Sequence, residues 1–233
     1  MRRRNRALFV IIILLLCTFL FAGINLLHKV DYKTDTIYEE NDTDITSDEA
    51  EQKSDWRLIL VNASHKIPQN YEITLLELSN GRRVDERIYP DLQEMFNDAR
   101  AEGVYPIVGE GYRTREEQEE IMENKIRAFE AEGHSHRQAV KLAKEWVAEP
   151  GTSEHQLGLA LDINAADGEE SWDVYTWLSK NAYKYGFILR YPQGKEAITG
   201  IDYEPWHYRY VGRETAANMY NQGLTLEEYL QED

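Results

Sequence analysis

Cysteine is nearly absent from this chain of 233 residues, because the single one, Cys17, lies in an apolar run near the N-terminus. The rest of the chain must therefore fold without disulfide bonds. A lipid anchor on Cys17 is not expected either, since Leu14-Leu15-Leu16 stand where such an anchor requires small residues. We interpret Cys17 as a small apolar side chain.

Basic residues are also scarce, and most of the chain is strongly acidic. The formal net charge is -16, and five of the 26 Lys and Arg residues precede Asp31. From Asp31 to the C-terminus, 21 basic residues stand against 42 acidic ones. Such a charge repels phosphates and anionic lipid head groups, and no basic groove is evident. Nucleic acid is therefore not an expected partner.

The N-terminal residues indicate export from the cytoplasm. Residues 8–27 form an almost unbroken apolar run of 20 residues, close to the length that crosses a bilayer as a helix. The Arg-rich segment 1–7 should stay in the cytoplasm, which places the rest of the chain outside the cell. We predict an uncleaved, single-pass signal anchor in the cell membrane. The alternative is a secreted protein, cleaved after the small residues Ala22 and Gly23.

Two further segments come after the predicted anchor. Residues 28–55 are rich in Asp, Glu, Ser and Thr and cannot bury enough apolar surface to offset the entropy of ordering, which predicts a flexible acidic linker. Residues 56–233, about 180 in number, suffice for one globular domain with a single core. They contain no internal repeat, and the sequence does not indicate an oligomeric state.

The apolar patterns in this domain predict a mixed fold. Short apolar runs predict strands at 58–61, 73–78, 105–108, 159–164, 187–190 and 207–211. Helical spacing and N-cap residues predict helices from 88 to about 102, from 115 to about 130, at 137–148, at 172–183, and after Thr225. Helices gather early and strands late, so we expect an α+β fold with a small, mainly antiparallel sheet.

Two motifs about forty residues apart contain the residue types of a catalytic metal site. Residues 153–162 supply His155 and Asp162, and residues 204–207 supply His207 and a further acid, Glu204. Catalytic zinc sites use three protein ligands and leave a fourth position for water. A glutamate that is not a ligand can take a proton from that water and pass it to the leaving amine. The pattern therefore indicates metal-assisted hydrolysis.

The spacing within both motifs does not fit a regular strand, since offsets of seven and three residues fall on opposite faces. Gly158 allows a turn between His155 and Asp162, and Pro205 makes the segment before His207 irregular. The alternative is a surface histidine and a capping aspartate. His134 and His136 have a chelating spacing but lie in a Gly/Ser break, and we interpret them as structural or surface residues.

Together these motifs resemble the D-alanyl-D-alanine carboxypeptidase family of zinc metallopeptidases. This family includes vancomycin-resistance D,D-carboxypeptidases and bacterial L,D-carboxypeptidases. The resemblance extends over most of residues 56–212. It also rests on Leu60-Val61-Asn62, on Gly111-Tyr112-Arg113-Thr114 with Gln118, on Pro150-Gly151-Thr152 and on the segment 186–192.

The resemblance implies a small α+β fold whose central antiparallel sheet bears one zinc ion. It implies His155, Asp162 and His207 as the zinc ligands and Glu204 as the general base. Arg113, Gln118 and Ser153 would line the substrate site, where Arg113 could clamp a carboxylate or stabilise an oxyanion. Three alternatives stay open: an ion pair for Arg113, a solvated Gln118, and a structural ion pair for Arg190.

The substrate implied by the family and by the predicted location is a peptidoglycan stem peptide ending in D-alanine. We expect a D,D-carboxypeptidase acting on pentapeptides, with an L,D-carboxypeptidase acting on tetrapeptides as the first alternative. An endopeptidase that cuts wall cross-links is a second alternative. The third is a zinc-bearing binding module without catalysis, which would not need Glu204.

Overall fold

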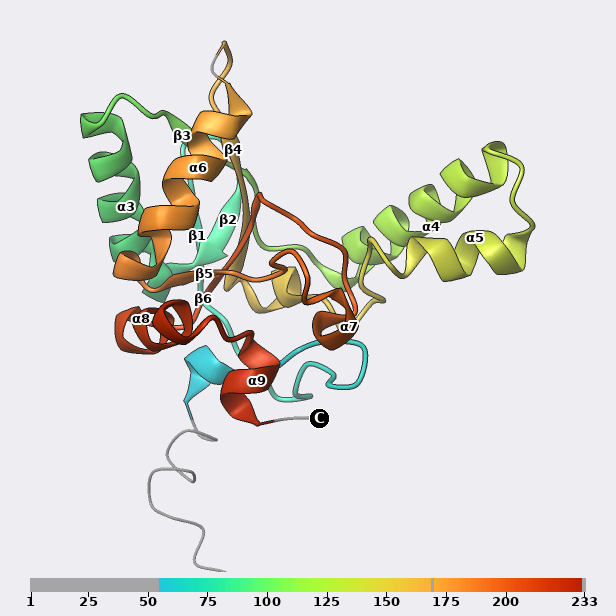
Figure 1. Cartoon of the computed structure of the whole chain (residues 1–233). Helices are drawn as coiled ribbons and strands as arrows, with labels where there is room; N and C mark the ends of the chain where they lie inside the picture. Colours follow the sequence, from blue (N-terminus) through green and yellow to red (C-terminus); the bar gives the residue numbers. More distant parts are fainter. Residues whose placement is uncertain (1–54, 169, 232–233) are drawn as a thin grey trace, which may run out of the picture. The chain divides into compact units, whose positions relative to one another are not determined.

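The computed structural model describes residues 55–168 and 170–231, all of which belong to the unit Ile45–Asp233. A four-stranded antiparallel sheet has the strand order β3-β4-β6-β5 (Figure 1). Its strands are β3 (Pro106–Glu110), β4 (Ala160–Ala165), β5 (Phe187–Leu189) and β6 (His207–Tyr210). A second antiparallel sheet pairs β1 (Leu75–Glu77) with β2 (Arg83–Asp85). The predicted α+β class with an antiparallel sheet is confirmed.

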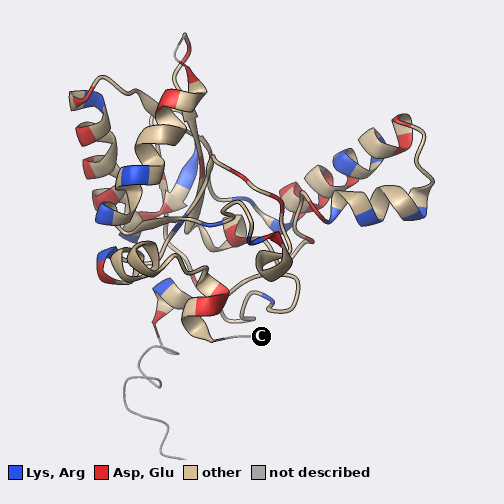
Figure 2. Cartoon of the chain, viewed as in Figure 1, with Lys and Arg blue, Asp and Glu red and all other residues tan. Residues whose placement is uncertain are grey.

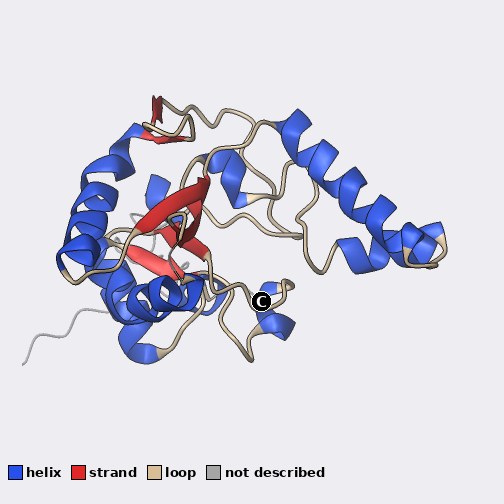
Figure 3. Cartoon of the chain, turned by 90° about the horizontal axis from the view of Figure 1, so that it is seen from above, coloured by secondary structure: helices blue, strands red, loops and turns tan. Residues whose placement is uncertain are grey.

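Helices surround this sheet. The longer ones are α3 (Tyr89–Ala101), α4 (Arg115–Ala131), α5 (His136–Ala143), α6 (Ser171–Asn181) and α8 (Arg213–Gln222). The short ones are α7 (Glu196–Thr199) and α9 (Leu226–Leu230), with the 3-10 helices η1 (Trp56–Leu58), η2 (Glu86–Ile88), η3 (Glu154–Leu157) and η4 (Ala182–Tyr185). Helices α4 and α5 form a hairpin that extends away from the sheet in both views (Figures 1 and 3).

One face of the four-stranded sheet is apolar and forms the core. Strand alternation directs Leu161 and Ile163 of β4 and Tyr208 of β6 to this face, where all three are almost fully buried. Helices α3 and α6 cover it, with Met95 and Leu178 in the same cluster. The residues between them in β4 and β6 therefore face the other way, and these include Asp162 and His207.

Several helix ends lie where their capping residues predict them. The hydroxyl of Thr114 accepts a hydrogen bond from the Glu117 backbone N–H, and the Glu117 carboxylate accepts one from the Thr114 N–H, which completes a capping box for α4. Thr225 begins α9 in the same way. The helix predicted at 137–148 begins one residue earlier and ends at Ala143.

The strand predicted at 58–61 is wrong. This segment begins in η1 and then continues without pairing to a strand. The backbone here is paired with a side chain instead: the carbonyl oxygens of Ile59 and of Arg57, just before the segment, accept hydrogen bonds from the Arg209 guanidinium at 3.0 and 2.9 Å. Strand β2 and helices α7 and α8 were not predicted.

The predicted anchor, residues 8–27, and the linker up to residue 54 lie outside the described residues. Within the described ranges no helix combines the length and the apolar character needed to cross a bilayer. Figure 2 shows Lys and Arg on many of the same elements as Asp and Glu.

Gly158 makes the turn that the sequence requires between His155 and Asp162. It ends η3 in the left-handed region, with φ of +69°, and its carbonyl accepts a hydrogen bond from the Asp85 backbone N–H. A Cβ atom there would lie 2.4 Å from Ile73 Cδ1 and 3.1 Å from the Asp85 nitrogen. Conformation and space therefore both exclude a side chain at this position.

We expect Gly158→Ala to lower the free energy of unfolding more than Gly223→Ala does. Gly223 has a similar φ of +66°, but nothing lies within 4 Å of a Cβ built there. Gly223→Ala should cost only the left-handed backbone, about 1–2 kcal/mol. Gly158→Ala should cost about 1–3 kcal/mol more because of overpacking. Chemical denaturation of both variants measures the difference, and equal losses would show that the space around Gly158 is unimportant.

Candidate metal centre

The pairing of β4 with β6 brings the aspartate and one histidine together. Asp162 and His207 are direct cross-strand partners, so their side chains leave the sheet on the same face. His207 Nδ1 lies 3.2 Å from Asp162 Oδ1. Glu204 precedes β6 in a turn that is closed by a hydrogen bond from the His207 N–H to the Glu204 carbonyl. Because this turn, which contains Pro205, is not regular strand, the side chains of Glu204 and His207 lie close together although they are three residues apart.

The other histidine enters from η3. His155 Nδ1 lies 2.8 Å from the Gly111 carbonyl oxygen, which can only accept a hydrogen bond, so this nitrogen carries the ring proton. The lone pair of Nε2 then points to the other side, and Nε2 lies 3.5 Å from Asp162 Oδ1. The ring is almost fully buried, at 3% exposure. Its orientation is therefore fixed before any ion arrives.

The three side chains fit a tetrahedral divalent ion. One ligand atom from each of His155, Asp162 and His207 lies within 4.8 Å of the others. Two ligands at about 2.0–2.1 Å from a tetrahedral zinc ion lie about 3.3 Å apart. The separations of 3.2 and 3.5 Å from Asp162 Oδ1 to the two histidine nitrogens match that value. Asp162 Oδ1 is buried without a hydrogen-bond partner, which suits an atom reserved for a ligand.

Glu204 lies beside this cluster without belonging to it. Its Oε2 is 3.5 Å from His207 Nδ1, and the residue is 9% exposed. Burial raises the pKa of Glu204 to about 7; the nearby Asp162 also raises it, while His207 and Arg113 lower it. A buried carboxylate with a pKa near neutrality can both accept and release a proton.

The two histidines differ in their affinity for protons. Burial lowers the pKa of His155 below its ordinary value. Burial also opposes protonation of His207, but Asp162 and Glu154 outweigh it and raise the pKa of His207 to about 9. The pKa of Asp162 is lowered well below its ordinary value, because the two histidines outweigh the effect of its burial.

The residues expected to bind substrate have protein partners in the structure. Arg113 Nη2 lies 3.2 Å from Asp162 Oδ2, so the ion pair considered as an alternative is present. Gln118 is buried rather than solvated: its side-chain N–H donates to the Ala148 carbonyl at 2.8 Å, and its oxygen accepts from Arg113 at 3.3 Å. Ser153 is buried directly before η3, and its hydroxyl makes no capping bond to that helix.

A buried charge network behind the cluster was not predicted from the sequence. Arg190 is fully buried and donates to Glu154 at 2.8 Å and to Glu227 at 2.6 and 2.9 Å, which assigns it the structural ion pair. Arg209 donates to Glu154 at 2.9 Å. Burial alone would raise the pKa of Glu154, but the two guanidinium groups overcome this and hold it well below the ordinary value. The period-two spacing of His207 and Arg209 was the available signal for this network.

The remaining candidate histidines lie apart from the cluster. The side chain of His136 is 75% exposed and pairs with Glu130 at 2.8 Å. The ring of His134 contacts the ring of Phe129 edge-on. Both belong to the hairpin of α4 and α5, which agrees with a structural or surface role.

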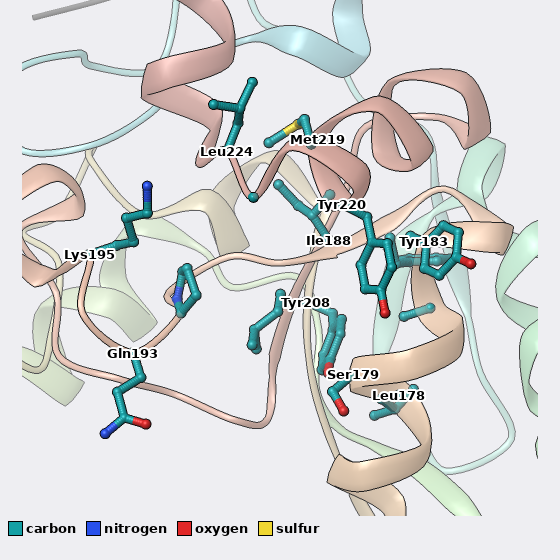
Figure 4. A pocket seen from close by; sticks show the side chains of 15 residues that line it. Leu178, Ser179, Tyr183, Ile188, Gln193, Lys195, Tyr208, Met219, Tyr220 and Leu224 are labelled. Atoms are coloured by element: carbon teal, nitrogen blue, oxygen red, sulfur yellow. The ribbon is translucent and has the colours of Figure 1, made fainter.

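A mostly apolar cavity of about 300 Å³ lies beside Tyr208 of β6 (Figure 4). Tyr208, which alternates with His207 along the strand, lines it together with residues of α6, η4, β5 and α8. Tyr183 and Tyr220 stack at 3.9 Å between ring centroids. None of His155, Asp162 and His207 lines this cavity.

Comparison with known proteins decides the family. Residues 81–213 match the family model described as "VanY: D-alanyl-D-alanine carboxypeptidase". The chain belongs to the D-alanyl-D-alanine carboxypeptidase family. A D-alanyl-D-alanine carboxypeptidase of Enterococcus faecalis is 55% identical over 193 residues, which cover 82% of this chain and 72% of that protein. The resemblance predicted from the motifs is thus confirmed.

Solved structures agree with this assignment. A mutant of the vancomycin resistance D,D-pentapeptidase VanY from the VanB-type cassette, in complex with Zn(II), is 57% identical with a TM-score of 0.74. The match covers 76% of this chain and 99% of that one. VanYB in complex with D-alanine-D-alanine is also 57% identical, with a TM-score of 0.75 and coverage of 76% and 98%. Members of this family therefore combine this fold with zinc and with a D-alanine dipeptide.

Proposed function

We propose that this chain is a zinc-dependent D,D-carboxypeptidase that removes the terminal D-alanine from peptidoglycan stem pentapeptides. In this proposal His155, Asp162 and His207 bind the zinc ion, and Glu204 is the general base. The convergence of these three ligand atoms within 4.8 Å, next to a buried acid, is the observation that carries the proposal. The similarity to VanY enzymes supports the substrate class.

The chemistry divides between the ion and the side chains. Zinc in such a site lowers the pKa of a water molecule to about 7 and polarises a carbonyl group. Glu204, buried and close to His207, takes the proton of the attacking water and delivers it to the nitrogen of the departing D-alanine. His155 donates its Nδ1 proton to the Gly111 carbonyl, so its other nitrogen stays unprotonated for the metal.

Arg113 is the group proposed to recognise the substrate. Its charge is permanent, and it lies beside the metal ligands through its contact with Asp162. Gln118 orients the guanidinium from α4, so we assign Gln118 a positioning role in addition to the predicted contact with substrate. Arg113 can bind the terminal carboxylate or the negative charge that develops on the scissile carbonyl oxygen. Ser153 remains the proposed hydrogen-bonding partner of the peptide.

The location of this activity is inferred from the N-terminal sequence. We propose that residues 8–27 anchor the chain in the bacterial cell membrane, with residues 28–55 as a linker and the domain 56–233 outside the cell. Stem peptides of the cell wall are accessible there. A secreted form, cleaved behind the apolar run, would meet the same substrate.

We expect His155→Ala to abolish stable zinc binding. A wild-type chain should retain about one zinc ion, whereas loss of one of three ligands leaves too few donors for a catalytic site. His136→Ala, which removes an exposed histidine of the hairpin, serves as the control and should keep the ion. Metal analysis after dialysis measures the content. Full retention of zinc by His155→Ala would contradict the proposed ligand set.

We expect Glu204→Gln to keep zinc and lose activity. Removal of a general base lowers kcat by about 10²–10⁴-fold, whereas the three ligands stay in place. Glu77→Gln, on the exposed side of β1, is the control and should release D-alanine at the wild-type rate. If Glu204→Gln retained the wild-type rate with zinc bound, Glu204 could not be the base.

The choice of substrate is tested with the two stem peptides. Full-length protein loaded with zinc should release D-alanine from a pentapeptide muropeptide and leave the tetrapeptide intact. Release from the tetrapeptide alone would identify an L,D-carboxypeptidase instead. Cleaved cross-bridges without free alanine would identify an endopeptidase.

A further inference from the structure

Glu154 lies at the centre of the buried charge network, directly before the candidate ligand His155. It is fully buried, and its Oε1 atom accepts hydrogen bonds from Arg190 Nε at 2.8 Å and from Arg209 Nη1 at 2.9 Å. Its other oxygen, Oε2, is buried and has no hydrogen-bond partner among the described residues. Buried carboxylate oxygens without a partner are rare, so this atom requires an explanation.

The group that faces this oxygen is the far side of the His207 ring. His207 Nε2 lies 3.7 Å from Glu154 Oε2, and it too is buried without a partner in the described part of the chain. On the near side of the same ring, Nδ1 lies 3.2 Å from Asp162 Oδ1, within the metal cluster. Two unpaired polar atoms therefore face each other across a gap that is about 0.5 Å too long for a hydrogen bond.

Metal binding would complete this pair. A neutral imidazole that binds an ion through Nδ1 carries its proton on Nε2, and that proton needs an acceptor in a buried site. Glu154 Oε2 is the unpaired acceptor next to it. In His155 the two nitrogens have the opposite roles: Nδ1 carries the proton and donates it to the Gly111 carbonyl, and Nε2 faces the metal cluster.

We propose that Glu154 is a positioning residue for the metal, which accepts the Nε2 proton of His207 and fixes the orientation of that ring. Arg190 and Arg209 hold the carboxylate in place from the other side. Arg190 is itself held by Glu227 of α9, and Arg209 by the backbone carbonyls of Arg57 and Ile59. The inference rests on the metal site of the proposed function and adds a residue to it.

The competing explanation is that Glu154 only neutralises two buried arginines. Glu227 provides a matched control, because it is also a buried glutamate that accepts hydrogen bonds from Arg190. It differs from Glu154 in its second partner, which is the Asn62 side chain and not His207. A purely neutralising role predicts the same effect for both substitutions. A positioning role predicts that only Glu154 affects the ion.

The test compares Glu154→Gln with Glu227→Gln in the full-length protein. Glu154→Gln should weaken zinc binding by about 10–100-fold, the usual effect of losing an outer partner of a histidine ligand. Glu227→Gln should change zinc affinity less than about 3-fold, although both variants lower the melting temperature of the metal-free chain. Competition with a chelator measures the affinity. Equal losses of affinity in the two variants, or no loss in a folded Glu154→Gln, would overturn the proposal.

A second measurement needs no variant and covers the case in which Glu154→Gln does not fold. In the zinc-loaded wild-type chain with ¹⁵N-labelled histidine, the proton of His207 should reside on Nε2 and exchange slowly with water. A proton on Nδ1, or one that exchanges as fast as that of the exposed His136, would overturn the positioning role. A wild-type chain that binds no zinc would instead refute the proposed function, and this inference with it.

Discussion

The antiparallel pairing of β4 with β6 is the constraint on which the candidate metal centre depends. Asp162 and His207 can meet only because they are direct cross-strand partners on the same face. A shift of one residue would turn Asp162 into the core and bring Leu161 or Ile163 to the site. Such a shift is very unfavourable, because it would bury the Asp162 carboxylate in the apolar core that Leu161, Ile163 and Tyr208 form in the observed register. The packing of the apolar face thus fixes the geometry of the polar one.

The polar face contains an unusual concentration of buried charge. Arg190, Arg209 and Glu154 are completely buried, and Glu227 is almost so. Isolated ions in such a place would be very costly, and each is tolerated because an opposite charge lies within hydrogen-bond distance. Hydrophobic residues could fill the same volume with less penalty. The presence of charged residues here instead agrees with a role in holding the candidate ligand His207, in addition to any role in stability.

Local signals in the sequence were sufficient for much of the fold and for the residues that converge at the site. Helix α4 was predicted from Thr114 and its acidic first turn, and β4 from the alternation after Gly158. His155, Asp162 and His207 were predicted from residue type and motif. The segment 58–61 was misjudged because its apolar residues resemble a strand, whereas its backbone pairs with the side chain of Arg209. Partners so distant in sequence leave no local periodicity, which also explains why the contacts of Gln118 and Glu154 were not predicted.

The ion pair between Arg190 and Glu227 joins the buried charge network to the last described element of the chain. Glu227 lies in α9, which comes after every other described element along the chain and is synthesised after them. Until α9 has docked, Arg190 has only part of its compensating charge, that of Glu154. The charge balance of the buried network is therefore completed late in biosynthesis, after most of the domain has been synthesised.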